Sequence, residues 1–116
     1  EFEMKVKEIV KKMKLKVVAG KDFLEREAKG GYAGDLLSDV LAGSKEGDVW
    51  LTVQVHPNII AVSAMKGHCA ILITSSKTIE EETIEKAKEE KITILSTPLN
   101  TFEAAGKLSR LLENGG

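Results

Sequence analysis

The sequence predicts a three-layer αβα domain with a mostly parallel sheet of four or five strands and helices on both faces. Segments with helical spacing of apolar residues alternate with short apolar runs, which is the pattern of repeated βαβ units. Several of these segments end at a glycine or begin at a proline. The chain has 116 residues without a linker, repeat or low-complexity tract, so it fits a single domain over residues 1–116.

The first part of the chain is predicted to run from an amphipathic helix through one strand to a glycine-rich loop. Apolar residues recur at helical spacing, with lysines between them, at Phe2, Val6, Ile9, Val10 and Met13. A β-branched run over residues 15–19, ended by Gly20, predicts a strand. Three segments follow: a helical turn over 22–26, a glycine-rich loop over 29–34 and a helix over 35–42.

The rest of the chain is predicted to hold three strands, each followed by a helix. Residues 49–55 alternate between two faces, and Pro57 then suits the first position of a helix that ends at Gly67. Apolar runs over 69–74 and 92–95 predict the other two strands. Capping boxes are predicted at Thr78 with Glu81 and at Asn100 with Glu103. The last helix is predicted to bury Ala104, Ala105, Leu108, Leu111 and Leu112.

Charge and composition argue against nucleic acid and membranes as partners. The 17 basic and 18 acidic residues give a net charge of -1, and aromatic residues make up only 4% of the chain. The apolar runs are too short to span a bilayer, and no signal peptide is visible. The single cysteine, Cys69, excludes an internal disulfide and suits the cytoplasm. Abundant Lys and Glu beside one glutamine, Gln54, hint at a thermophilic source.

Catalytic and cofactor motifs are not apparent in the sequence. His56, His68 and Cys69 lack the spacing of a zinc site, so we expect no metal and no cofactor. No nucleophile elbow, Walker loop or dinucleotide fingerprint occurs. Asp35 and Asp39 share one face of a predicted helix, where they form either a carboxylate pair or a solvated surface. We therefore predict a domain that is not an enzyme.

Polar residues follow each predicted strand, at the edge of the sheet where open α/β folds bind ligands. Most of these tips lead into a helix N-terminus, whose free N–H groups and dipole favour an anion. Ordinary helix capping explains the same residues. The glycine-rich loop has two interpretations as well, either close approach of the backbone to a ligand or a tight turn. The four tips are 20–22, 56–58, 74–76 and 96–98.

Several segments in order resemble the DRTGG domain family over about residues 15–108. Glu25 stands where the family has Asp, and Lys29 where it has Thr, so a role that needs a hydroxyl at position 29 is not carried over. The matching segments are Glu25-Arg26, Lys29-Gly30-Gly31, residues 31–40, Thr52-Val53-Gln54, residues 56–61 and Ser96-Thr97-Pro98.

The resemblance implies a compact α/β unit similar to the N-terminal domain of HPr kinase, without the active site of the kinase. Such domains occur in some phosphotransacetylases and beside CBS domains in regulated pyrophosphatases, as regulatory and dimer-forming modules near adenine-nucleotide effectors. They also occur as short free-standing proteins.

The leading hypothesis is a regulatory, ligand-sensing domain, expected to be a homodimer that binds a small anion or adenine nucleotide. One alternative is a scaffold that packs on a partner enzyme. The other is a phosphotransfer or acyl-phosphate enzyme. The residues expected to contact the ligand or the second subunit are Arg26, Gly30, Gly31, Asp35, Ser38, Asp39, Thr52, His56, Asn58 and Thr97.

Overall fold

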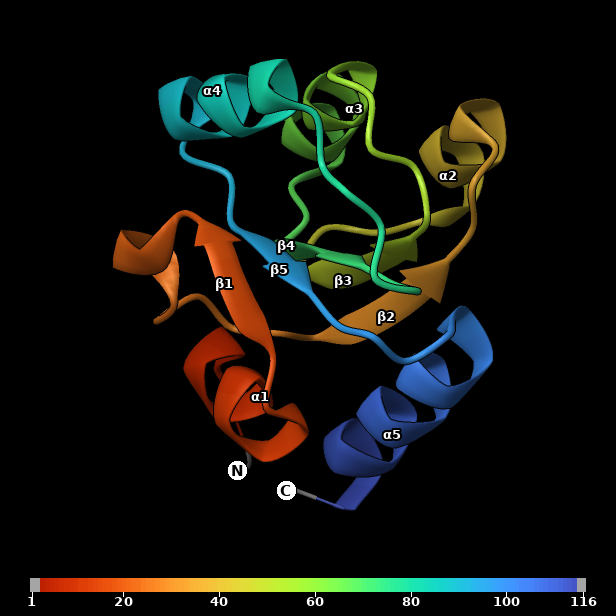
Figure 1. The fold of residues 1–116 in the computed structure, drawn as a ribbon. Coiled ribbons are helices and arrows are strands. Elements are labelled where there is room, and N and C mark those ends of the chain that lie inside the picture. The colour runs from red at the N-terminus through yellow and green to blue at the C-terminus, as the bar shows by residue number, and fades with distance from the viewer. Residues whose placement is uncertain (1–2, 115–116) are drawn as a thin grey trace.

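The computed structural model describes residues 3–114 as alternating helices and strands (Figure 1). Phe2, predicted to belong to the first helix, lies outside the described residues. The elements are α1 (Val6–Met13), β1 (Lys16–Ala19), the 3-10 helix η1 (Lys21–Phe23), β2 (Gly30–Ala33), α2 (Leu37–Gly43), β3 (Asp48–Thr52), α3 (Asn58–Lys66), β4 (Ala70–Ile73), α4 (Glu81–Glu90), β5 (Ile94–Ser96) and α5 (Thr101–Asn114).

The five strands form one sheet in the order β1-β5-β4-β3-β2. Strands β2 to β5 are mutually parallel, and β1 pairs antiparallel with β5 through an irregular register between Val17 and Ala19. The predicted fold class is thus confirmed. Because β1 runs against its neighbour, the tip at Gly20 lies at the opposite edge from the other strand tips, and its assignment to the ligand edge is wrong.

Helices cover both faces of the sheet, as Figure 1 shows, with α1 and α5 on one face and α2, α3 and α4 on the other. Strand β3 lies inside the sheet and alternates between the two cores. Val49 and Leu51 pack with Leu108 of α5, whereas Trp50 packs with Ile59 of α3. A parallel strand covered on both faces is buried throughout, and all five residues of β3 are buried.

Residues 30–33, predicted to belong to a loop, form the edge strand β2 instead. They pair in parallel with β3, from Gly30 opposite Asp48 to Ala33 opposite Leu51. The small residues let the strand fit against its neighbours, since a Cβ atom at Gly31 would lie 3.1 Å from the side chain of Leu108. The glycines therefore serve close packing within a sheet.

Two helix starts test the predicted capping boxes. Asn100 and Glu103 form theirs, with Glu103 N–H donating to Asn100 Oδ1 at 2.8 Å and Asn100 N–H to Glu103 Oε1 at 3.3 Å. The box at Thr78 is wrong, because α4 begins only at Glu81 and its N-cap is Glu80. Thr83 instead anchors the start of α4 by donating to the carbonyl of Val55 at 2.6 Å.

Strand β3 is shorter than predicted. It ends at Thr52, because the next N–H group, that of Val53, donates to the carboxylate of Asp35. Within residues 3–114, no helix is long and apolar enough to cross a membrane.

Candidate functional site

The ends of β2, β3, β4 and β5 share one edge of the sheet, called here the carboxyl edge. Because these strands are parallel, the helices that follow them, α2 to α5, all begin there. Five of the predicted site residues lie at this edge, in strand ends, in turns or, for Asn58, at the first position of α3: Asp35, Thr52, His56, Asn58 and Thr97.

Asp35 joins the turn after β2 to the turn after β3. Its Oδ1 atom accepts a hydrogen bond from the buried hydroxyl of Thr52 at 2.7 Å and another from Val53 N–H at 2.9 Å. Its backbone carbonyl accepts from the side-chain amide of Gln54 at 2.9 Å. Asp35 thus holds the end of the glycine-rich segment against β3.

The turns after β4 and β5 hold each other. Ser75 and Ser76 both adopt left-handed backbone conformations, with φ values of 65° and 53°. Their N–H groups donate to the carbonyls of Leu99 at 2.8 Å and Thr97 at 3.1 Å. A non-glycine residue in this conformation costs roughly 1–2 kcal/mol, so these bonds sustain a strained tip. The sequence marked this tip as polar but gave no signal of its backbone conformation.

The start of α3 places two polar side chains in solvent. His56 and Asn58 are both exposed, and Nδ1 of His56 accepts a hydrogen bond from Asn58 N–H at 3.3 Å. Thr97, by contrast, is buried, and its hydroxyl accepts from Leu99 N–H at 3.2 Å. His56 and Asn58 are therefore free to meet a ligand, whereas Thr97 braces its turn.

The two aspartates that the sequence placed on one helix face do not share a helix, because α2 begins at Leu37 and holds only Asp39. Asp39 accepts a hydrogen bond from the hydroxyl of Tyr32 at 2.6 Å, whereas Asp35 bonds to Thr52 and Val53. The bond to Asp39 raises the pKa of Tyr32, with desolvation as the second cause. The carboxylates thus hold different partners, and Ser38, between them, is exposed.

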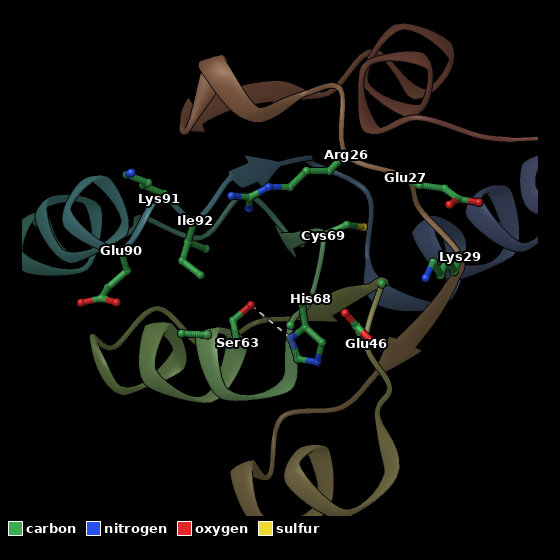
Figure 2. Close-up of a pocket in the computed structure, with 13 residues that line it drawn as sticks. Arg26, Glu27, Lys29, Glu46, Ser63, His68, Cys69, Glu90, Lys91 and Ile92 are labelled. Atoms are coloured by element: carbon green, nitrogen blue, oxygen red, sulfur yellow. Dashed lines mark hydrogen bonds between the residues drawn. The ribbon is translucent and has the colours of Figure 1, made fainter.

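Arg26 lies at the opposite, amino edge of the sheet, away from the rest of the predicted site. It lines a hollow of about 510 Å³, where β3, β4 and β5 begin (Figure 2). The guanidinium stacks over the ring of Phe23, 4.8 Å from its centroid. Within residues 3–114, the only ion pairs join Glu25 to Lys5 and Lys7, so none lies in the hollow. Its charged lining consists of Arg26, Lys29, Lys91, Glu27, Glu46 and Glu90.

A buried hydrogen-bond chain runs beside this hollow through His68. Ser44 donates to the carbonyl of Val40 at 2.6 Å, so its oxygen accepts from Nε2 of His68 at 2.9 Å. Nδ1 of His68 then accepts from the hydroxyl of Ser63 at 3.1 Å, the bond drawn dashed in Figure 2. Burial lowers the pKa of His68, which favours the neutral ring. The side-chain polar atoms of Ser44, His68 and Ser63 thus all have a hydrogen-bond partner.

The neighbouring cysteine is held as a thiol. Burial raises the pKa of Cys69 to about 12, so the nucleophilic thiolate is disfavoured. Ser63 is fully buried as well, so its hydroxyl meets no solvent despite its bond to an imidazole. Among residues 3–114, no group of three or more His, Cys, Asp and Glu side chains is placed to hold a metal ion.

Residues 8–111 match the family described as the DRTGG domain. The chain belongs to the DRTGG domain family. The resemblance predicted from the sequence is thereby confirmed over almost the same stretch. No curated protein sequence matches the chain.

A solved structure with a similar fold contains the CBS and DRTGG domains of the regulatory region of Clostridium perfringens pyrophosphatase, complexed with the activator diadenosine tetraphosphate. The TM-score is 0.71 at 20% sequence identity, with 96% of this chain covered. The match covers 46% of the other chain, so this DRTGG domain spans about half of that structure.

Gly30 and Gly31 lie on β2, the outermost strand of the sheet, between its carboxyl edge and its amino edge. A Cβ atom at Gly30 would come within 2.9 Å of Asp48 Oδ1, which explains why no larger residue fits there without movement. The predicted site residues therefore fall into three places: the carboxyl edge, the edge strand β2, and the amino edge with Arg26.

Proposed function

We propose that this DRTGG domain is a regulatory domain without catalytic activity of its own, which senses an adenine nucleotide or another small anion. The family supports the regulatory role, and the similar fold belongs to the regulatory region of a pyrophosphatase in complex with a nucleotide activator. The protonated Cys69 and the buried Ser63 support the absence of a nucleophile.

The observation that carries the ligand site is the meeting of four helix N-termini at the carboxyl edge. Helix N-termini bear partial positive charge and favour anions. Ser38, His56 and Asn58 add exposed hydrogen-bonding side chains at the same edge. The site proposed for the anion therefore lies over the start of α3, whose first turn holds no acidic residue, whereas Asp35 and Asp39 lie at the start of α2.

The hollow at the amino edge is the less favourable place for an anion. Helices α2, α3 and α4 end there, which brings the negative ends of their dipoles to it. Three carboxylates, of Glu27, Glu46 and Glu90, line the hollow beside its three cationic side chains. Its volume of about 510 Å³ would nevertheless accept a small molecule, so the test must distinguish the two edges.

The test is a thermal-shift screen with AMP, ADP, ATP, diadenosine tetraphosphate, acetyl phosphate and inorganic phosphate. A ligand at a hundred times its Kd adds about 2.7 kcal/mol of stability, which raises the midpoint by several degrees or more. We expect the shift to disappear in His56→Ala and Asn58→Ala and to persist in Arg26→Ala. Loss in Arg26→Ala alone would move the site to the amino edge, and a flat screen would contradict ligand sensing.

The second candidate function is a scaffold that packs on a partner enzyme, favoured by the open edge of β2. A partner enzyme and a homodimer both remain proposals for this chain. Turnover of a phosphorylated substrate by the purified protein would instead favour an enzyme. It would contradict both the regulatory proposal and the scaffold proposal.

A further inference from the structure

The hollow at the amino edge carries charges of both signs that do not pair with one another. Three cationic side chains and three carboxylates line it, yet within residues 3–114 the only ion pairs lie elsewhere, where Glu25 meets Lys5 and Lys7. Unpaired charges at a partly buried surface attract a ligand of opposite sign more strongly than charges in open water do. The hollow therefore offers binding groups of both signs to one molecule.

Arg26 supplies the group that binds an anion. Its half-buried side chain extends over the hollow toward Ile92, as Figure 2 shows. One face of the guanidinium stacks on Phe23, 4.8 Å from the ring centroid, and the preceding carboxylate, that of Glu25, is engaged by two lysines. The N–H groups of a guanidinium lie in its plane, so the stacking leaves them available to a carboxylate, whose two oxygens they match.

Glu46 supplies the group that binds a cation. It lies in the turn before β3, and its stem packs beside Gly67, where a Cβ atom would come within 3.2 Å of Glu46 Cγ. Gly67 is the C-cap of α3, and α4 also ends at this edge, so the negative ends of both helix dipoles favour a cation here. Lys66, at the end of α3, does not line the hollow. This side of the hollow therefore suits an ammonium group.

The floor of the hollow is uncharged. Burial lowers the pKa of His68 and raises the pKa of Cys69 to about 12, so the imidazole is neutral and the thiol is protonated at neutral pH. Small residues at positions 47, 64 and 67 leave space above these groups. Recognition of a charged ligand is therefore left to the rim, where Arg26 and Glu46 lie.

Backbone hydrogen bonds hold the two binding groups in fixed places. Lys29 N–H donates to the carbonyl of Gly47 at 2.9 Å, which joins the segment after Arg26 to the turn that carries Glu46. Gly47 N–H donates in turn to the carbonyl of Gly67 at 2.9 Å, at the end of α3. Binding groups that are positioned before a ligand arrives lose less entropy when it binds. The rim of the hollow is thus pre-organised.

We propose that the amino-edge hollow is a second ligand site, which binds a small zwitterion with its carboxylate at Arg26 and its ammonium group at Glu46. The volume of about 510 Å³ lies within the roughly 300–1,000 Å³ of small-molecule sites. A molecule with two separated charges suits a rim of three cationic and three anionic side chains, whereas a simple anion or cation meets repulsion from half of them. This site lies at the opposite edge from the one proposed for a nucleotide and does not depend on it.

The test is a titration of the isotope-labelled full chain, followed through its backbone amide resonances. The probes are amino carboxylates from glycine to aminohexanoate, which hold the two charges at increasing separation. Hexanoate and hexylamine each carry only one of the charges and serve as matched controls. We expect a zwitterion of fitting length to shift the amides of Gly47, Gly67 and Ile92 but not those of His56 and Asn58. It should bind about tenfold or more tightly than either control.

Two variants locate the site. Arg26→Lys keeps the positive charge but loses the paired donors, and Glu46→Gln removes the negative charge, so each should raise the Kd of the zwitterion about tenfold or more. Arg110→Lys and Glu85→Gln are the matched controls, because both residues are exposed, lie on α5 and α4, and do not line the hollow. The Kd should stay unchanged in both controls. A dispersed amide spectrum shows that each variant is folded.

Absence of amide shifts around the hollow with every zwitterion would overturn the proposal. Equal binding of hexanoate would make the hollow an anion site, and equal binding of hexylamine would make it a cation site, so either result contradicts the proposal as well. The same holds for a Kd that stays unchanged in both Arg26→Lys and Glu46→Gln. Thermal shifts with nucleotides are measured separately, so a failure here leaves the ligand proposed for the carboxyl edge standing.

Discussion

The two edges of the sheet use polar residues in different ways. At the carboxyl edge, Asp35 is exposed and joins two turns through bonds to Thr52 and Val53, beside free side chains such as His56. At the amino edge, His68 is 4% exposed and bonded at both ring nitrogens. A buried, satisfied chain stabilises one arrangement, whereas exposed groups on braced turns remain available to a ligand.

This comparison predicts the largest loss of stability at the amino edge. Replacing His68 with Ala leaves a cavity beside Trp50, whose ring centroid lies 5.5 Å away, and removes the partner of the Ser63 hydroxyl. We expect a loss of roughly 2–4 kcal/mol, measured by urea denaturation followed through Trp50 fluorescence. His56→Ala is the control at the other edge. An equal loss in both variants would remove the distinction between the edges.

The next largest loss of stability is expected at Asp35, which is exposed but whose carboxylate accepts two hydrogen bonds. Asp35→Ala should destabilise the domain by roughly 1.5–3 kcal/mol, because the buried Thr52 hydroxyl and Val53 N–H lose their acceptor. Asp35→Asn keeps an oxygen at that position and should lose less. If the two variants were equally unstable, the carboxylate oxygen would not be what holds the turns together.

The pH dependence of stability distinguishes the edges further. Burial lowers the pKa of His68 in the folded protein below its usual value of 6.5, so the unfolded chain binds the proton more readily. The stability this group contributes is present above pH 6.5 and is lost as the pH falls toward its folded pKa, by at most about 1.4 kcal/mol per pH unit. Denaturation curves between pH 7.5 and 5 should show a shallower decline for His68→Gln than for the wild type.

The sequence predicted the layers well because periodicity depends on local spacing. The alternation of Val49, Trp50 and Leu51 between two faces is visible in the sequence and appears in the two cores. The direction of β1 was not visible, because nothing within residues 16–19 specifies whether its partner runs parallel. Likewise, Gly30 and Gly31 have low strand propensity, and their place in β2 comes from packing against β3 and Leu108, which are distant in sequence.

The candidate site stays a prediction, and the structure shows only how its residues are grouped. Asp35, His56 and Asn58 follow parallel strands, so their common edge followed from the predicted topology. Arg26 was grouped with them by resemblance, and the structure places it at the opposite edge, where its segment is bonded to the start of the chain through Val6 N–H and the Arg26 carbonyl. The bond between Tyr32 and Asp39 joins a strand to a helix, and no local pattern signals it.

The smallest expected effect concerns that bond. Tyr32 is the only tyrosine, so the absorbance of its phenolate near 295 nm reports its titration alone. The hydrogen bond to Asp39 favours the protonated phenol, so the pKa of Tyr32 should lie above its usual value of 10. Asp39→Asn should bring it back toward 10, and Asp35→Asn should not, because Asp35 bonds elsewhere. A pKa that stays unchanged in Asp39→Asn, or falls equally in Asp35→Asn, would contradict the assignment of Asp39 as the partner of Tyr32.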